Sequence, residues 1–244
     1  MTTTPVFLVD VLPVGPSAVL TGPEGHHAAT VRRVRAGELL DLADGAGGVA
    51  RCSVTSVGRD TVALAVLDLR RLPAPAPRLV VAQALAKGDR GELAVELLTE
   101  AGVDVLVPWA AERCVVRWTG ERGARSLSRW RSTAREAAKQ SRRVWLPEVC
   151  DPVGTAALVD LAVLCAATYV LHESASLPLA GVTVPTGGDI LVVVGPEGGI
   201  SDRELAVLSG AGALAVRLGD SVLRTSSAGL AAVAVLSAAT GRWS

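Results

Sequence analysis

The sequence has 244 residues, 50% of them hydrophobic, and a formal net charge of zero, so the chain can bury a core in one large domain or two ordinary ones. No apolar run approaches the roughly 18 residues of a membrane span, and the first residues lack the pattern of a signal peptide, so we expect a cytoplasmic protein without membrane contact. The 4 cysteines form no CxxC pair, which argues against a zinc knuckle or a redox motif.

The first part of the chain, up to about residue 69, alternates short β-rich runs with turn signals. Only the segment His26–Val34 looks helical. Asp44-Gly45 and Gly47-Gly48 predict a hairpin turn between two strands, which favours a small β-barrel or sandwich. Residues 73–77, Pro-Ala-Pro-Ala-Pro, predict a stiff spacer between two domains.

After Arg78 the pattern changes to alternating strands and helices, which predicts an α/β fold with a mostly parallel sheet covered by helices on both faces. The strand-like runs are 79–85, 103–109, 144–149, 167–173, 189–194 and 213–218, and the helical ones are 91–101, 128–142, 155–164, 202–208 and 225–240. Ligands of such sheets bind outside the carboxyl ends of the strands. We therefore expect the loops after Glu173, Val194 and Leu218 to form a site.

Basic residues are concentrated in one segment: Arg113 to Arg143 holds 10 basic residues and only 2 acidic ones. A second cluster comprises Arg32, Arg33 and Arg35. Such blocks are either the solvated face of a helix or a footprint for a polyanion, and charge alone does not decide between the two.

Several common catalytic motifs are absent: the chain has no GxxxxGK[ST], HExxH or GxSxG. Residues 45–50 fit GxGxxA, but they lie between two predicted strands and are better explained as a hairpin turn. His172-Glu173 has no second histidine nearby, so we expect no metal site.

The glycine loop, residues 195–201 with the sequence Gly-Pro-Glu-Gly-Gly-Ile-Ser, follows a predicted apolar strand and leads into a predicted helix. Pro196 lacks a backbone donor and Glu197 adds a negative charge, so this loop is poorly suited to phosphate and favours a neutral or cationic ligand. Ser201 and Glu204 form a capping box that needs no ligand, but capping does not explain the residues before Ser201.

The loop 218–225, Leu-Gly-Asp-Ser-Val-Leu-Arg-Thr, enters the last helix, for which Thr225 or Ser226 can serve as the cap. Read alone, it is a polar connection. Together with the glycine loop and with Leu171-His-Glu173 at the same sheet edge, it predicts a composite pocket.

Several motifs in order along the chain resemble the RsmE family of ribosomal RNA methyltransferases. They are HHAATVRRVRAGELLDLADG (26–45), QALAKGDR (83–90), ELLTEAGVDVLVPWAAERCVV (96–116), RWRSTAREAAKQSRR (129–143), LHE, GPEGGIS and LGDSVLRT. The likeness spans most of the chain.

This resemblance implies a PUA-like β-barrel RNA-binding domain at 1–72, the linker at 73–77, and a SPOUT methyltransferase domain at 78–244 with a carboxyl-terminal trefoil knot. It also implies a homodimer that uses S-adenosylmethionine to methylate N3 of a uridine in 16S rRNA, with either the naked RNA or the assembled small ribosomal subunit as substrate.

The resemblance also assigns residues to the site. The cofactor-binding residues would be Leu171, His172, Glu173, Gly195, Pro196, Glu197, Gly198, Gly199, Ile200, Leu218, Gly219, Leu223 and Thr225. The chemistry of the implied reaction adds two further roles: Arg224 would stabilise the uracil anion, and Glu197 or Glu173 would take the proton or favour the charge of the methyl donor. RNA contacts are expected from Arg32, Arg33, Arg35, Arg113 and Arg142.

Two positions differ from the family pattern. Ser226 stands where the motif LRTETA commonly has glutamate, and Pro5-Val6-Phe7 lacks the arginine expected before the first aromatic residue. The rival readings are a nucleotide- or NAD-dependent enzyme and a non-catalytic RNA-binding module. Binding of S-adenosylhomocysteine would separate all three.

Overall fold

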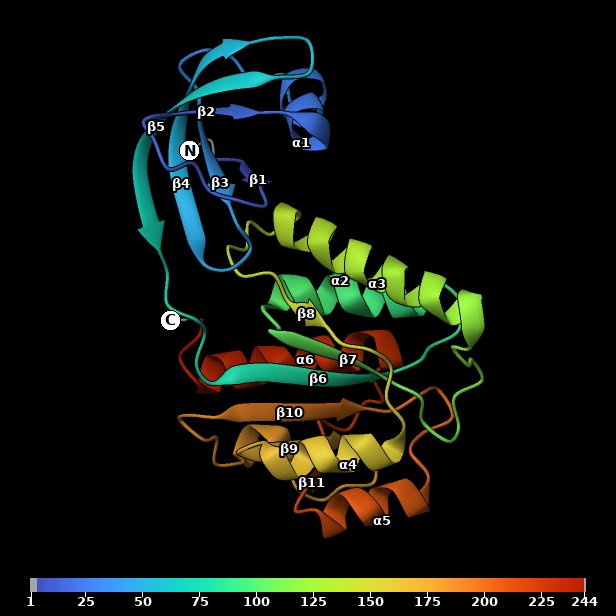
Figure 1. Cartoon of the computed structure of the whole chain (residues 1–244). Helices are drawn as coiled ribbons and strands as arrows, with labels where there is room; N and C mark the ends of the chain where they lie inside the picture. Colours follow the sequence, from blue (N-terminus) through green and yellow to red (C-terminus); the bar gives the residue numbers. More distant parts are fainter. Residues whose placement is uncertain (1–3, 244) are drawn as a thin grey trace. The chain divides into compact units, whose positions relative to one another are not determined.

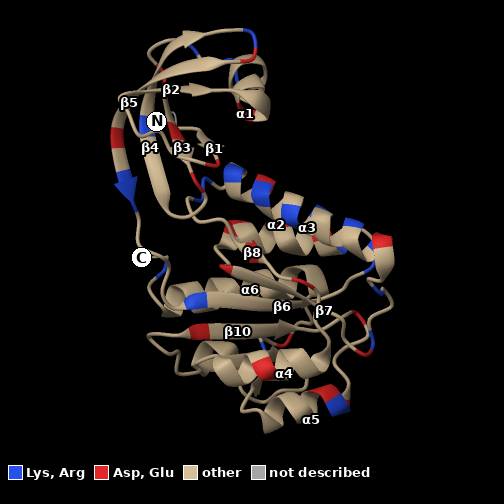
Figure 2. Ribbon diagram, in the orientation of Figure 1, with Lys and Arg blue, Asp and Glu red and all other residues tan. Residues whose placement is uncertain are grey.

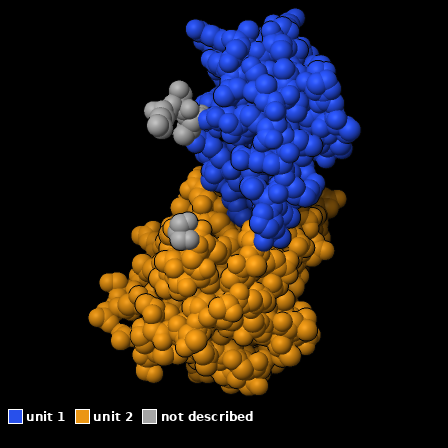
Figure 3. Space-filling view, turned by 90° about the vertical axis from the view of Figure 1, so that its left-hand side faces the viewer, with its two compact units in different colours: residues 1–74, 138–146 blue, residues 75–137, 147–244 orange. Residues whose placement is uncertain are grey.

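The computed structural model describes residues 4–243 and divides the chain into two compact units, shown in separate colours in Figure 3. The first unit contains residues up to Ala74 together with Ala138–Leu146, and the second contains Pro75–Ala137 and Pro147 onward. The domain boundaries predicted from the sequence differ at this point, because they assign residues 138–146 to the second domain.

The first unit is built on a five-stranded sheet with the order β1-β3-β4-β5-β2 (Figure 1). Its strands are β1 (Val6–Leu8), β2 (Ser17–Leu20), β3 (Leu39–Ala43), β4 (Gly48–Val57) and β5 (Val62–Arg71). β1 pairs with β3 in parallel, and the other pairs are antiparallel. Phe7, Leu40 and Leu64 are at most 1% exposed and belong to its core.

The predicted hairpin turn is confirmed between β3 and β4. The carboxylate of Asp44 accepts hydrogen bonds from the backbone N–H groups of Ala46 and Gly48, at 2.7 and 2.8 Å. Gly45 and Gly47 have φ angles of 72° and 86°, a conformation that glycine adopts without strain. The helical segment predicted at His26–Val34 lies earlier in the structure, which has an α-helix, α1 (Gly22–His26), followed by a π-helix, η1 (His27–Val31).

The second unit contains a six-stranded sheet with the order β11-β9-β10-β6-β7-β8, in which every neighbouring pair is parallel. Its strands are β6 (Arg78–Ala84), β7 (Val105–Trp109), β8 (Glu148–Val149), β9 (Ala167–Leu171), β10 (Asp189–Val194) and β11 (Leu214–Val216). β6 and β10 are nearly continuous apolar runs because both of their faces are buried. The predicted α/β fold with a parallel sheet is confirmed.

Five α-helices follow strands of this sheet along the chain: α2 (Arg90–Ala101), α3 (Gly120–Gln140), α4 (Thr155–Leu164), α5 (Asp202–Gly210) and α6 (Thr225–Ala239). α6 packs against α2, β6 and β10. Gly229 permits this approach, because a Cβ atom there would lie 3.1 Å from the Leu98 side chain of α2. Leu158 and Ala162 of α4 are buried in the same core.

Two predicted elements of the second domain differ most in extent from those observed. α3 begins at Gly120 rather than Ser128, because the residues before Ser128 include good helix formers and Gly123 fits closely against the backbone of Trp118. Only Glu148–Val149 of the predicted strand 144–149 pairs with β7. Trp145 instead forms a bridge with Ala46 and donates to the Pro73 carbonyl at 3.1 Å, both within the first unit.

Candidate active site

The loops after β9, β10 and β11 line one pocket of about 550 Å³ in the second unit. These strands are neighbours and parallel, so their carboxyl ends meet at one edge of the sheet. The predicted site residues that line the pocket are Leu171, His172, Glu173, Gly195, Pro196, Glu197, Gly199, Ile200, Leu218, Gly219, Leu223, Arg224 and Thr225. The predicted composite pocket is therefore present in the fold, and the roles of its residues stay predictions.

Gly198, also predicted to bind the cofactor, does not line the pocket. It lies against Arg113, since a Cβ atom at Gly198 would lie 3.3 Å from the Cβ of Arg113. The loop makes a tight turn closed by a 2.9 Å hydrogen bond from the Gly199 N–H to the Pro196 carbonyl. Gly199 has φ 73°, and a Cβ on Gly195 would lie 2.7 Å from the Ile200 side chain. These contacts explain why glycine stands at three positions of the loop.

Arg90, the first residue of α2, also lines the pocket and was not among the predicted site residues. Its guanidinium lies 3.4 Å from the Glu197 carboxylate. Arg90 ends the motif QALAKGDR, which begins in the last two residues of β6, and β6 is the neighbour of β10 in the sheet. The parallel order therefore brings a fourth loop to the same edge.

Arg224 lies at the N-cap of α6, and its carbonyl accepts hydrogen bonds from the N–H groups of Ser227 and Ala228, both at 2.9 Å. The prediction that Thr225 or Ser226 caps this helix is wrong, because the helix begins at Thr225 and no side chain caps it. The Arg224 side chain is exposed at the pocket, whereas Arg217 of the same loop pairs with Asp220 at 2.6 Å.

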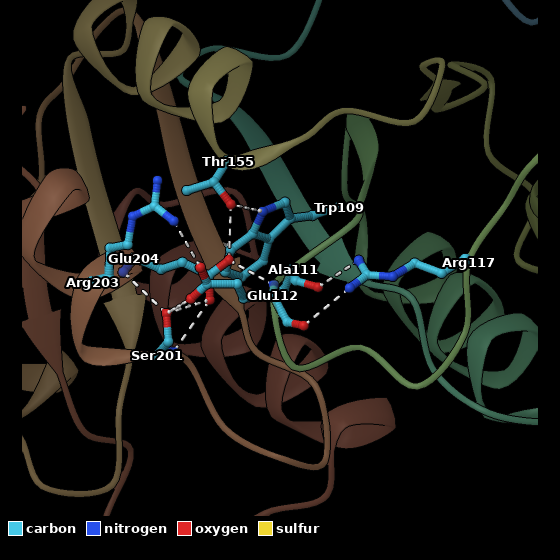
Figure 4. Close-up of polar contacts among 8 residues, drawn as sticks. All are labelled: Trp109, Ala111, Glu112, Arg117, Thr155, Ser201, Arg203 and Glu204. Atoms are coloured by element: carbon cyan, nitrogen blue, oxygen red, sulfur yellow. Dashed lines mark hydrogen bonds and ion pairs between the residues drawn. The ribbon is translucent and has the colours of Figure 1, made fainter.

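The predicted capping box is confirmed and is part of a wider hydrogen-bond network at the start of α5 (Figure 4). The carboxylate of Glu204, only 2% exposed, accepts hydrogen bonds from Glu112 N and Thr155 Oγ1, both at 2.8 Å. It also accepts from the backbone N–H of Ser201 at 3.2 Å, and the Ser201 hydroxyl oxygen lies 3.1 Å from the same carboxylate oxygen. One buried side chain thus joins the segment after β7 to the starts of α4 and α5.

Glu112 extends this network from the segment after β7. Its carboxylate accepts a hydrogen bond from the Ser201 hydroxyl and pairs with Arg203 at 3.0 Å. The Ser201 hydrogen bond, followed by the charge of Arg203, lowers the pKa of Glu112, although partial desolvation opposes this shift. Arg117 fixes the same segment by donating to the carbonyls of Ala111 and Glu112, both at 3.1 Å.

The predicted RNA-binding arginines are distributed over both units. Arg32, Arg33, Arg35 and Arg142 are exposed in the first unit. Arg113 belongs to the second unit, and its guanidinium donates to the Gly198 and Ile200 carbonyls at 3.2 and 3.4 Å.

Basic residues are spaced along α3 (Figure 2), and several of them pair with carboxylates of the second unit. Arg125 lies 2.9 Å from Glu121, Arg129 lies 3.5 Å from Glu92, and Arg131 lies 3.0 Å from Asp151. These pairs favour the solvated-helix interpretation for these three arginines.

Within residues 4–243, no group of three or more His, Cys, Asp or Glu side chains is placed to hold a metal ion. Among the same residues, none of the helices combines the length and the hydropathy of a membrane-spanning segment.

Comparison with known proteins gives a consistent result. Residues 73–237 match the family described as an RNA methyltransferase domain, and residues 20–67 match an RNA methyltransferase PUA domain. A relative from Mycobacterium bovis, named ribosomal RNA small subunit methyltransferase E, is 47% identical over 98% of this chain and 93% of its own length. A protein of the same name from Bacillus subtilis is 30% identical over 91% of this chain and 90% of its own.

A solved structure is similar over the whole chain. The crystal structure of a ribosomal RNA small subunit methyltransferase E from Neisseria gonorrhoeae bound to S-adenosyl methionine is 28% identical, with a TM-score of 0.84. The alignment covers 97% of this chain and 98% of that one. Fold, pocket and family matches together define an RNA methyltransferase with a PUA domain. More narrowly, the chain belongs to the ribosomal RNA small subunit methyltransferase E (RsmE) family.

Proposed function

We propose that this protein transfers a methyl group from S-adenosylmethionine to N3 of a uridine in 16S rRNA. The observation that carries the proposal is the pocket itself, in which the LHE, GPEGG and LGDSVLRT loops of an RsmE-family chain meet at one sheet edge. The structure of the Neisseria gonorrhoeae relative bound to S-adenosyl methionine supports the choice of cofactor.

The residues of the pocket fit this cofactor. A volume of about 550 Å³ lies in the usual range for small-molecule sites, and Gly219 has no atom within 4 Å of where its Cβ would stand, so backbone and ligand can approach closely. The lining combines apolar side chains such as Leu171 and Ile200 with the carboxylates of Glu173 and Glu197. Bound there, the cofactor supplies an electrophilic methyl group on a sulfonium centre.

Arg224 would stabilise the uracil anion, because a guanidinium stays charged at neutral pH and can donate two hydrogen bonds to an oxyanion. Uridine N3 carries a proton that has to leave before or during methyl transfer. Glu197 and Glu173 are the candidate acceptors. The pairing of Glu197 with Arg90 favours an electrostatic role for Glu197, which leaves Glu173 as the more available base.

RNA docking in this proposal uses the exposed Arg32, Arg33, Arg35 and Arg142 of the first unit, with phosphate as the contacted group. Affinity for an rRNA fragment should then fall steeply with added salt. We further propose the arrangement typical of this family: a PUA-like barrel, a trefoil knot around the cofactor loops, a homodimer and a cytoplasmic location. The packing of α6 against α2, β6 and β10 is compatible with the knot.

Calorimetric titration with S-adenosylhomocysteine tests the proposal. Binding with a Kd in the micromolar range or tighter is the expected result. No binding would favour a non-catalytic RNA-binding module, and binding of NAD instead would favour a dehydrogenase.

A further inference from the structure

The side chain of Arg113 is hydrogen-bonded to the glycine loop of its own chain. Its Nη1 atom donates to the carbonyls of Gly198 and Ile200, at 3.2 and 3.4 Å, on the glycine loop. The loop also packs against Arg113. A Cβ atom at Gly198 would lie 3.3 Å from the Cβ of Arg113 and 3.4 Å from its backbone carbonyl oxygen. The side chain therefore supports the loop through both its guanidinium and its aliphatic part.

These contacts fix two peptide groups of the loop at both ends. In the Gly198–Gly199 peptide, the carbonyl accepts from Arg113, and the N–H donates to the Pro196 carbonyl at 2.9 Å. In the Ile200–Ser201 peptide, the carbonyl accepts from Arg113, and the N–H donates to Glu204 Oε2 at 3.2 Å. Because a trans peptide directs its C=O and N–H in opposite directions, fixing both ends sets the orientation of the whole group.

The loop needs such support because of its composition. Gly198 and Gly199 carry no Cβ, so the peptide between them can turn over at little steric cost, and Gly199 already has φ 73°. Each turned-over form would present different backbone groups to the pocket. A charged donor on the outer side of the loop selects one of these forms.

The support is itself fixed. Arg117 donates to the carbonyls of Ala111 and Glu112, which precede Arg113, at 3.1 Å each. The backbone N–H of Glu112 donates to buried Glu204 at 2.8 Å. The two residues immediately before Arg113 are therefore held in place by hydrogen bonds, which fixes the point from which its side chain reaches the glycine loop.

We propose that Arg113 is a positioning residue for the cofactor: it holds the glycine loop in the conformation that binds S-adenosylmethionine, and it is not an RNA contact. This inference rests on the proposed function of the pocket. It reassigns the role that charge alone indicated for Arg113.

The test compares Arg113→Ala with Arg122→Ala, which removes one exposed positive charge from α3 of the same unit. Titration with S-adenosylhomocysteine should show a Kd about tenfold higher for R113A, the effect of losing hydrogen bonds to a charged donor, and no change for R122A. Amide hydrogen exchange should be faster for Gly199 and Ser201 in R113A only. Arg113→Lys, which retains the charge and a donor, should recover part of the affinity.

The outcomes separate the inference from the proposed function. If the wild type does not bind S-adenosylhomocysteine, the proposed function fails, and hydrogen exchange still decides whether Arg113 holds the loop. Unchanged exchange and unchanged affinity in R113A, together with weaker binding to an rRNA fragment, would overturn the inference in favour of an RNA contact. Thermal melting of each variant checks that R113A is folded, and R113K supplies the comparison if it is not.

Discussion

The guanidinium of Arg90 lies 3.4 Å from the carboxylate of Glu197, and both side chains line the same pocket. Arg90 follows β6 and Glu197 follows β10, so the pair joins the loops of two neighbouring parallel strands. With side chains 48% and 33% exposed, it contributes at most about 1 kcal/mol to folding. The main consequence of the pair is that Arg90 holds the Glu197 carboxylate in position at the pocket.

Glu197→Gln should weaken binding of S-adenosylmethionine about tenfold more than binding of S-adenosylhomocysteine, because only the former carries a sulfonium charge. Calorimetric titration of both compounds measures the difference. Asp202→Asn, an exposed carboxylate at the start of α5, is the matched control. Equal losses for the two compounds would mean that Glu197 only shapes the loop.

Arg224→Ala should lower kcat about 10²- to 10³-fold, the usual effect of removing a donor to a developing oxyanion. Affinity for the cofactor should change by less than about threefold, since the interaction strengthens only as the uracil anion forms. Arg224→Lys keeps the charge but loses the planar fork, so an intermediate rate is expected. Single-turnover kinetics and calorimetry together check this assignment, and a loss of cofactor binding alone would refute it.

Glu204→Gln should destabilise the protein by about 2–3 kcal/mol. The buried carboxylate accepts from the backbone N–H groups of Glu112 and Ser201 and from the Thr155 hydroxyl, and an amide nitrogen in place of one oxygen would face one or more of these donors. Urea unfolding measures the difference in the free energy of unfolding. The exposed change Asp202→Asn should cost less than about 0.5 kcal/mol, and a similarly small cost for E204Q would contradict the network.

Stability should fall in acid through Glu112, whose pKa is lowered in the folded state from the ordinary 4.5. A lowered folded-state pKa means that the carboxylate stabilises the protein above pH 4.5 and that this contribution is lost as pH falls through the folded-state value. Unfolding of the wild type and of Glu112→Gln, measured at several pH values, should give curves that differ near neutrality and converge in acid. A constant difference across that range would exclude this carboxylate as the cause.

Much of the site could be predicted from short patterns in the sequence. The capping box of Ser201 and Glu204, the turn at Asp44 and the glycine loop each depend on residues close together in the chain, so their patterns could be recognised. The parallel sheet could be inferred from the alternation of apolar strands and helices, and this placed three loops at one edge.

Long-range side-chain contacts were not predictable in the same way. Arg90 meets Glu197 and Arg113 meets Gly198 only because the strand order brings distant loops together. The local excess of basic residues could not distinguish Arg113, which is hydrogen-bonded to a loop, from an arginine whose side chain is exposed to solvent. Trp145 belongs to a strand-like sequence pattern, yet its indole N–H donates to the Pro73 carbonyl in the first unit. Because these two residues are far apart in the sequence, the local pattern could not predict this contact.

Methylation of small ribosomal subunits from a strain lacking this protein tests the central claim most directly. The subunits, or their naked 16S rRNA, would be incubated with the purified protein and methyl-labelled S-adenosylmethionine and then mapped by primer extension, because a methyl group on uridine N3 blocks base pairing and stops reverse transcriptase. The account predicts label in 16S rRNA and one new stop at a uridine, both appearing about 10²- to 10³-fold more slowly with Arg224→Ala. Absence of label from both substrates, or a methyl group on a different base, would contradict it.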